Sequence, residues 1–144
     1  MKKVLKVLNL GILVIMGVFV IGGIFRGVEA SKLYSKTEIT REDLQCESYM
    51  GSSITETESG SKDLYYKVRR LSGPEYIGPL EICANEVVDI TCTPGDAKIL
   101  LMDEQGKQCF YKEITELHLE PGNPGIYDLY IIGKWYTGEV KISY

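Results

Sequence analysis

One uncharged stretch near the start of the chain limits what the rest can fold into. Residues 7–25, nineteen in all, contain no charged side chain, and Lys2, Lys3 and Lys6 precede them. A helix of this length, rising about 1.5 Å per residue, would span roughly 28 Å, close to the hydrocarbon thickness of a bilayer. We therefore expect residues 1–30 to be a signal peptide or a signal anchor, separate from the folded domain.

Two outcomes for this segment stay open. The length of the run favours a retained transmembrane helix, because the apolar part of a signal peptide usually has about 7–15 residues. Val28 and Ala30, in contrast, are small residues in the positions that a signal peptidase needs. In both cases the three lysines should remain inside, so residues 31–144 should be extracytoplasmic, either anchored in the cell membrane or secreted.

The exported part is long enough for one domain. It has twelve Lys and Arg against nineteen Asp and Glu, a net charge of −7. Because nucleic acids bind to basic surfaces, we expect no nucleic-acid partner. Residues 31–63 are rich in Ser, Thr, Glu and Gly and predict a polar lead-in or linker. Within it, Thr40 and Asp43 could begin a short helix over residues 41–50, and the alternative is an edge strand over residues 49–57.

Residues 64–144 carry the signal of a β-domain. Four segments alternate apolar and polar residues, as in strands with one buried face. Their apolar positions are Leu64, Tyr66 and Val68; Val88, Ile90 and Cys92; Leu117 and Leu119; and Val140, Ile142 and Tyr144. Residues 97–102 and 126–132 are more continuously apolar, which predicts strands covered on both faces.

Glycine and proline mark the expected turns between these segments. They lie at Ser72–Pro74, Pro94–Gly95, Asp103–Gly106, residues 121–125 and Gly133–Gly138, the last of which would close a final hairpin. Seven or eight short strands with such spacing predict an all-β fold, an antiparallel β-sandwich or barrel.

The C-terminal part also resembles a known group of domains. Residues 117–122 read Leu-His-Leu-Glu-Pro-Gly, residues 125–134 read Gly-Ile-Tyr-Asp-Leu-Tyr-Ile-Ile-Gly-Lys, and residues 138–142 read Gly-Glu-Val-Lys-Ile. This succession is similar to the end of small exported bacterial β-sandwiches, of which the pre-peptidase C-terminal-like jelly rolls are the best known. The resemblance implies a jelly-roll-like fold with accessory or binding work.

Four cysteines, Cys46, Cys83, Cys92 and Cys109, lie in the exported part. An even number outside the cytoplasm makes disulfides an expectation, with three alternative connectivities. The alternative is an ordinary buried thiol, above all at Cys92, which shares the apolar face of its strand. No C-x-x-C pair is present, so we expect no zinc site.

No catalytic signature is found in the sequence. His118 is the only histidine, and it lies on the polar face of its segment without a nucleophile motif beside it. Asp103, Glu104 and Asp128 lack the spacing of a calcium loop. We therefore expect no catalytic residue, no metal and no cofactor.

Aromatic side chains are the remaining functional signal. Tyr127 and Tyr144 are expected in the core, whereas Trp135 and Tyr136 fall at the expected hairpin tip, where exposed rings could stack on a ligand. We expect a non-enzymatic binding or envelope-accessory protein, with a membrane partner through an uncleaved helix and with a protein or a cell-wall glycan as ligand. The alternative is a small exported enzyme, a hydrolase of unrecognised type.

Overall fold

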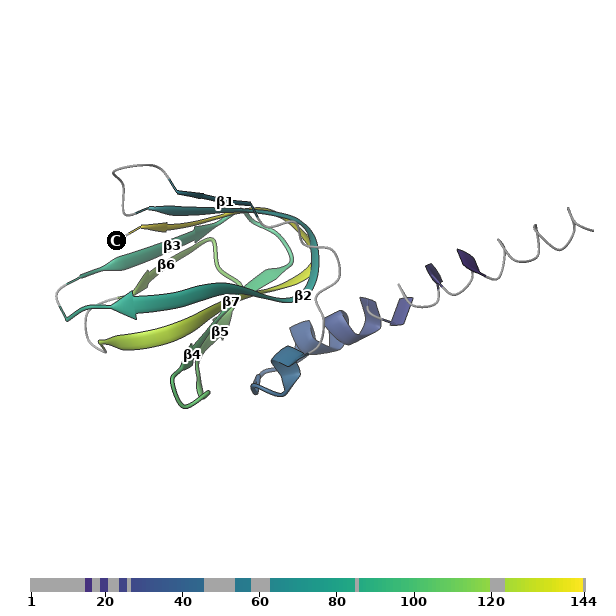
Figure 1. Ribbon diagram of the computed structural model, residues 1–144, viewed down its shortest axis with the longest axis horizontal. Helices are drawn as coiled ribbons and strands as arrows, with labels where there is room; N and C mark the ends of the chain where they lie inside the picture. The colour runs from purple at the N-terminus through teal and green to yellow at the C-terminus, as the bar shows by residue number, and fades with distance from the viewer. Residues whose placement is uncertain are drawn as a thin grey trace, which may run out of the picture.

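A computed structural model describes residues 15–16, 19–20, 24–25, 27–45, 54–57, 63–84, 86–119 and 124–143. Its strands form one antiparallel, curled sheet (Figure 1). They are β1 (Ile54–Thr57), β2 (Leu64–Ile82), β3 (Val88–Cys92), β4 (Ala97–Asp103), β5 (Gln108–Lys112), β6 (Glu116–Leu119) and β7 (Gly125–Ser143). A 3₁₀ turn, η1 (Asp43–Gln45), precedes them, and residues 27–35 form a helix.

The sheet is organised around β2 and β7, which have 19 residues each and pair along nearly their whole length. The first half of β2 and the second half of β7 pair with β1 and β3, and β3 in turn pairs with β6. The other halves of the two long strands form a layer with β4 and β5. Because both long strands bend, the two halves of the sheet face each other.

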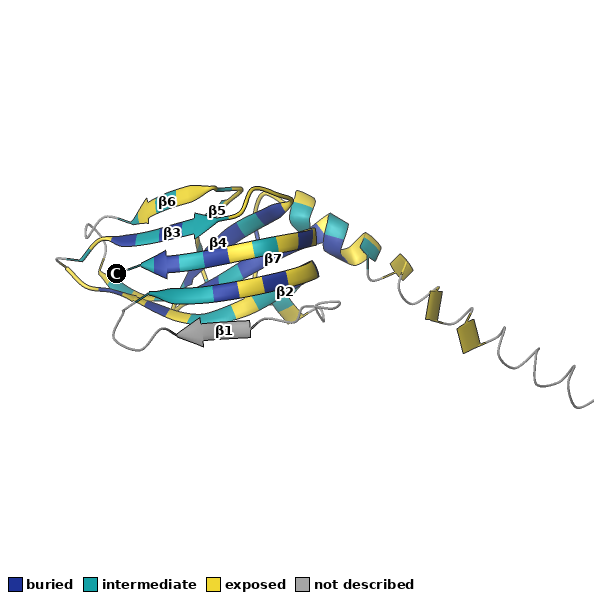
Figure 2. Ribbon diagram, turned by 90° about the horizontal axis from the view of Figure 1, so that it is seen from above, coloured by how far each residue is buried: buried dark blue, intermediate teal, exposed yellow. Residues whose placement is uncertain are grey.

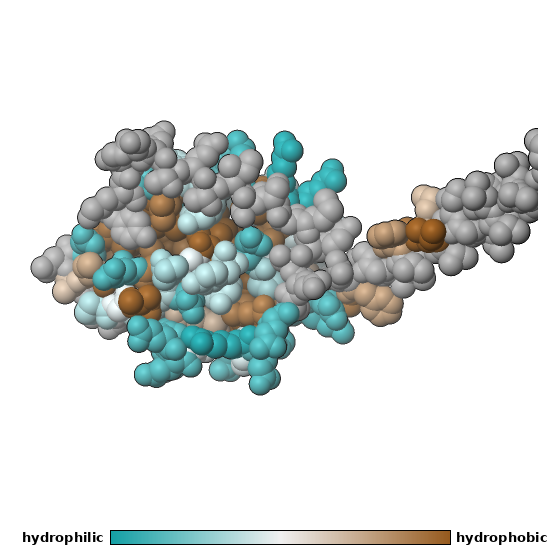
Figure 3. Space-filling view, in the orientation of Figure 1, coloured by the Kyte–Doolittle hydropathy of each residue, from teal (hydrophilic) through white to brown (hydrophobic). Residues whose placement is uncertain are grey.

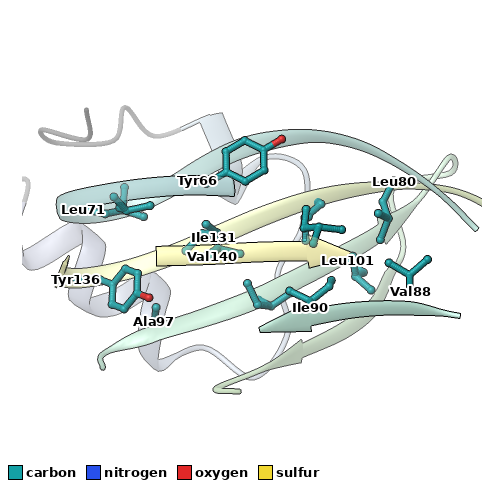
Figure 4. Packing of buried hydrophobic residues seen from close by; sticks show 14 of the residues in the cluster. Tyr66, Leu71, Leu80, Val88, Ile90, Ala97, Leu101, Ile131, Tyr136 and Val140 are labelled. Atoms are coloured by element: carbon teal, nitrogen blue, oxygen red, sulfur yellow. The ribbon is translucent and has the colours of Figure 1, made fainter. Parts of the chain in front are cut away.

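The main hydrophobic core fills the space between these halves. Its side chains come from both layers and include Val68 and Val140 from one and Ile99 and Ile131 from the other. Figure 4 shows side chains of this cluster gathered between the strands, among them Ile90 and Val140 from the first half and Leu101 and Ile131 from the second. At about 1.5–3 kcal/mol per fully buried aliphatic or aromatic side chain, this cluster is the principal source of stability.

The all-β prediction is confirmed, but two expected turns are absent. Ser72–Pro74 lies inside β2, and Gly133–Gly138 lies inside β7. The prediction of only short strands, with a final hairpin at Gly133–Gly138, is therefore wrong. These small residues instead serve the bend: Gly73 has a φ of 105°, and a β-carbon on Gly133 would lie 2.7 Å from the carbonyl oxygen of Leu71. Such a close backbone approach admits only glycine.

Several local predictions are confirmed. Strand β4 is covered on both faces, since Ile99 and Leu101 lie in the main core while Leu100 and Met102 lie in a second cluster. The hairpin at Asp103–Gly106 is present, with Gly106 at a φ of 80°. Strand β1 covers the described part of the expected edge strand.

The second cluster lies on the outer face of β4, β5 and β7, where the N-terminal segment covers it. Leu33 and Ile39 are 4% and 2% exposed and pack with Leu100, Met102 and Ile132. Thr40 and Asp43 form the reciprocal capping contacts that the sequence suggested, at the start of η1, and residues 46–50 of the expected helix lie outside the described residues. The first part of the expected lead-in thus contributes to a core of its own.

Candidate functional site

The two long strands bend at a pair of opposed bulges. Between Val68 and Leu71 the pairing gains one residue in β2, and between Leu71 and Ser72 it gains one in β7. Arg70 and Trp135 lie in these bulges with φ values of 50° and 59°, the two positive values among described non-glycine residues. Holding a side chain there costs about 1–3 kcal/mol, and such strain is concentrated at functional sites. The bend is therefore a candidate functional site.

Trp135 extends from its bulge toward the N-terminal helix. It is 53% exposed, and a β-carbon placed on Gly27 would lie 3.9 Å from its Cζ2 atom. Between the indole and the helix runs an open groove of about 890 Å³, within the size range of ligand sites. We name it the Trp135 groove; it is lined by Phe19, Val20, Ile24, Gly27, Val28, Ser31, Lys32, Ser35 and Trp135.

Polar side chains of the sheet hold the end of the helix in place. The ammonium of Lys98 donates a hydrogen bond to the carbonyl oxygen of Tyr34 at 2.6 Å and lies 4.7 Å from the ring centroids of both Tyr34 and Tyr111. The Tyr111 hydroxyl donates to the carbonyl oxygens of Leu33 and Tyr34 at 3.2 and 3.3 Å. A cation and a donor thus satisfy carbonyls that every helix leaves open at its C-terminus.

Burial of this contact also raises the pKa values of its two tyrosines. The pKa of Tyr111 is raised to about 12, first by burial and then by the charge of Glu113. Burial likewise raises the pKa of Tyr34, whose hydroxyl donates a hydrogen bond of 2.5 Å to Glu113. Both phenols therefore remain protonated donors at neutral pH. We call Tyr34, Lys98, Tyr111 and Glu113 the helix clamp.

The structure separates the two aromatic residues that the sequence placed together at a hairpin tip. Trp135 is exposed at a bulge within a continuous strand, whereas Tyr136 is 2% exposed and belongs to the main core (Figure 4). The Tyr136 hydroxyl donates to the carbonyl oxygen of Thr93 at 3.0 Å. A surface contact in this region would therefore be made by the Trp135 ring. Tyr127 packs against the main core, and Tyr144 lies outside the described residues.

His118 lies on the exposed face of β6, as its position in the sequence suggested. Its Nδ1 atom lies 2.5 Å from a carboxylate oxygen of Asp89, and its Nε2 atom lies 3.5 Å from Glu116. The hydrogen bond to Asp89, followed by the charges of Asp89 and Glu116, raises the imidazole pKa. With a carboxylate at each ring nitrogen, this histidine forms a surface ion cluster.

The described cysteines form no disulfide with one another. Cys92 packs against the main core, and burial raises its thiol pKa to about 12, whereas Cys109 is exposed. Cys83 lies exposed after β2, and Cys46 lies outside the described residues.

The acidic residues considered for calcium serve local contacts. Asp103 accepts hydrogen bonds from the backbone of Gln105 and Lys107 in its turn, and Asp128 accepts one from the Tyr76 hydroxyl. In the part of the chain that the structure describes, no three or more His, Cys, Asp or Glu side chains gather as metal ligands would.

No described helix is long and apolar enough to cross a membrane, and most of residues 7–25 lie outside the described part. The transmembrane and signal-peptide predictions fall largely on those residues. No protein-family model and no curated protein matches this chain.

Sequence reasoning missed the helix clamp and the bend. Lys98 is the one charged residue in an otherwise apolar run, a signal that it serves a particular contact. Leu33 and Ile39 are isolated apolar residues in a polar stretch, and no repeat of apolar residues around them predicts that they are buried. The strain at Trp135 leaves no local trace, because it depends on a partner strand more than fifty residues away in the chain.

Proposed function

We propose that this chain is an extracytoplasmic β-domain that keeps its N-terminal segment as a membrane anchor and works by binding, without catalysis. The observation that carries this proposal is the continuity of the helix. Residues 27–35 remain helical through the Val28–Ala30 site, where Ala30 is 3% exposed, and the helix clamp holds the next turn. Because this helix packs on the sheet through Ala30, Leu33 and the helix clamp, the segment would have a structural role in the folded chain, which favours retention over cleavage.

Two features support binding as the mode of action. The exposed Trp135 ring on a strained bulge is typical of a contact surface, since aromatic rings supply much of the energy of recognition. His118, the only histidine, is engaged by two carboxylates and has no described Ser or Cys among its contacts. The partner class expected from the sequence is a protein or a cell-wall glycan.

We further propose that the two halves of the curled sheet act as the layers of a jelly-roll-like sandwich. The shared core between them supports this, as does the resemblance of residues 117–142 to exported sandwich domains.

The anchor is tested by expressing the full chain in bacteria and separating the membranes. A retained anchor predicts an intact chain of 16.2 kDa in the membrane fraction after alkaline washing. A soluble chain whose first residue is Ser31 would show that the segment is a cleaved signal peptide, and the anchor would be refuted.

The binding role is tested by sedimentation of the detergent-solubilised chain with isolated cell wall and with envelope extracts. Trp135→Ala should weaken capture, and Tyr76→Ala is a matched control, because Tyr76 is an exposed aromatic residue in the same pair of long strands. Hydrolysis of the cell wall by the chain, lost in His118→Ala, would instead favour the enzyme alternative.

A further inference from the structure

The ring of Trp135 lies at a particular level along the N-terminal helix. The uncharged run ends at Phe25, and the indole lies beside Gly27. If residues 7–25 fill the hydrocarbon layer over roughly 28 Å, residue 27 lies about 3 Å beyond it, within the headgroup region. Tryptophan is enriched at this depth because its ring is apolar and its N–H is polar.

The described residues below this level, 15–16, 19–20 and 24–25, have apolar side chains that the domain leaves exposed. The large hydrophobic side chains that are exposed on described helical residues are 47–77% accessible, and they are Ile15, Met16, Phe19, Val20, Ile24, Phe25 and Val28. Figures 2 and 3 show the described parts of this segment leaving the domain, exposed in the first view and with apolar residues in the second. The Trp135 groove is continuous with this surface, since Phe19, Val20 and Ile24 line it.

Basic residues surround the bend although the exported part is acidic. Arg69 and Arg70 lie in the bulge of β2, Lys134 precedes Trp135 in β7, and Lys32 lines the groove. The structure shows these four side chains as exposed and records no ion pair between them and other described residues. Glu29 on the helix and Asp96, whose carbonyl oxygen accepts a hydrogen bond from the Lys134 amide, also lie here, but the four cations outnumber these two carboxylates. This part of a domain of net charge −7 can therefore complement the phosphates of lipid headgroups.

We propose that the Trp135 groove is a lipid site at the outer surface of the membrane, occupied by a phospholipid of the outer leaflet. The acyl chain lies along the helix beside Phe19 and Ile24, the indole of Trp135 sits at the boundary of headgroups and acyl chains, and the basic residues of the bend contact phosphate. The inference rests on the retained anchor of the proposed function. It assigns Trp135 to the membrane, in place of the protein or glycan contact considered for this ring under the proposed function, and it fixes the domain against the bilayer.

The test uses the intrinsic fluorescence of Trp135, the only tryptophan in the chain. The full chain is reconstituted in vesicles of phosphatidylcholine and phosphatidylglycerol, with acyl chains brominated either near the headgroup or near the methyl end. We expect blue-shifted emission, loss of most of its intensity with the shallow bromines, a smaller loss with the deep ones, and protection from iodide in water.

A matched control moves the fluorophore within the same two strands. In a Trp135→Phe, Tyr76→Trp double variant the reporter lies on β2 opposite Tyr130, five residues along β7 from the bend. At about 3.3 Å per residue this is roughly 16 Å away, so it should be open to iodide and insensitive to both brominated lipids. Reversing the charge of Lys134 with Lys134→Glu should reduce the shallow quenching, whereas Lys107→Glu, in the turn between β4 and β5, should leave it unchanged.

The outcomes separate this inference from the proposed function. A chain that does not float with the vesicles after an alkaline wash has no anchor, which refutes both. A chain that floats while Trp135 remains open to iodide and is quenched by neither lipid refutes the lipid site alone. Blue-shifted emission without lipid quenching, lost when the protein is diluted in lipid, would show a second copy of this chain in the groove and would also overturn the inference.

Discussion

Replacing Leu33 with alanine should release the end of the N-terminal helix from the sheet. Leu33 is 4% exposed and packs in the second cluster with Leu100, Met102 and Ile132. Buried leucine-to-alanine changes cost about 2–5 kcal/mol, depending on how far the site can collapse. Since this cluster is small and covered by one helix turn, we expect about 2–3 kcal/mol, at the lower end of that range.

The assay is urea unfolding of the full chain in detergent micelles. Circular dichroism reports the sheet, and the fluorescence of Trp135, which lies beside Gly27, reports the contact with the helix. Val28→Ala is the control on the same helix: Val28 is 47% exposed, so its loss should stay within about 0.5 kcal/mol. Equal unfolding free energies for the two variants would refute the packing of the helix on the sheet.

A double variant can establish the contact between the helix and β4. Leu33 and Met102 share the second cluster, so Leu33→Ala and Met102→Ala should couple by about 0.5–3 kcal/mol. Strict additivity would mean that the two side chains do not support one another.

Three further predictions concern single sites. Asp89 raises the pKa of His118, so the pair stabilises the fold below the ordinary histidine pKa, and this contribution is lost as the pH rises through the raised pKa. Asp89→Asn should therefore move the NMR titration of the single histidine to lower pH. A titration curve that does not move would contradict this pairing. Gly133→Ala should lower the free energy of urea unfolding by about 1–3 kcal/mol, because the new methyl would lie 2.7 Å from the Leu71 carbonyl oxygen. Gly27→Ala is the control: its methyl would lie 3.9 Å from the Trp135 ring, so the free energy of unfolding should stay unchanged or rise by up to about 1 kcal/mol. The half-buried thiol of Cys92, with its pKa raised to about 12, should react with maleimide more slowly than exposed Cys109 until urea unfolds the chain, and equally rapid native labelling at Cys92 would show that it is accessible.

The local pattern of apolar and polar residues predicted the short strands well, because each of them keeps the same surroundings along its length. The alternation at Val88 and Ile90 and the two-sided run of β4 both follow directly from side-chain chemistry, and the structure buries these residues as expected. Asp103–Gly106 also behaves as its residues dictate, because glycine at a positive φ closes a hairpin without help from distant parts of the chain.

The long bent strands could not be predicted in this way. Ser72–Pro74 and Gly133–Gly138 have the composition of turns, yet they meet in the β2–β7 pair, where Ser72 pairs with Lys134 and Gly73 with Gly133. This pairing keeps both strands extended. The same small residues that end a strand in isolation let a strand curl when a partner holds it. The candidate site depends on this non-local pairing, so Trp135 was recognised from its residue type and the groove beside it was not.

The pairing of β2 with β7 also sets the order in which the domain can form. β7 pairs with β2, β3 and β4, yet it follows all the other described strands in the sequence, and Leu64 pairs with Ile142. Contacts of such high contact order close late in folding. On the proposed topology, β7 also crosses the membrane after the other six described strands. The apolar faces of β2 and β4 therefore remain exposed outside the cell until β7 arrives. Deleting residues 125–144 would remove the central strand of the sheet, whereas deleting β1 would remove only an edge strand.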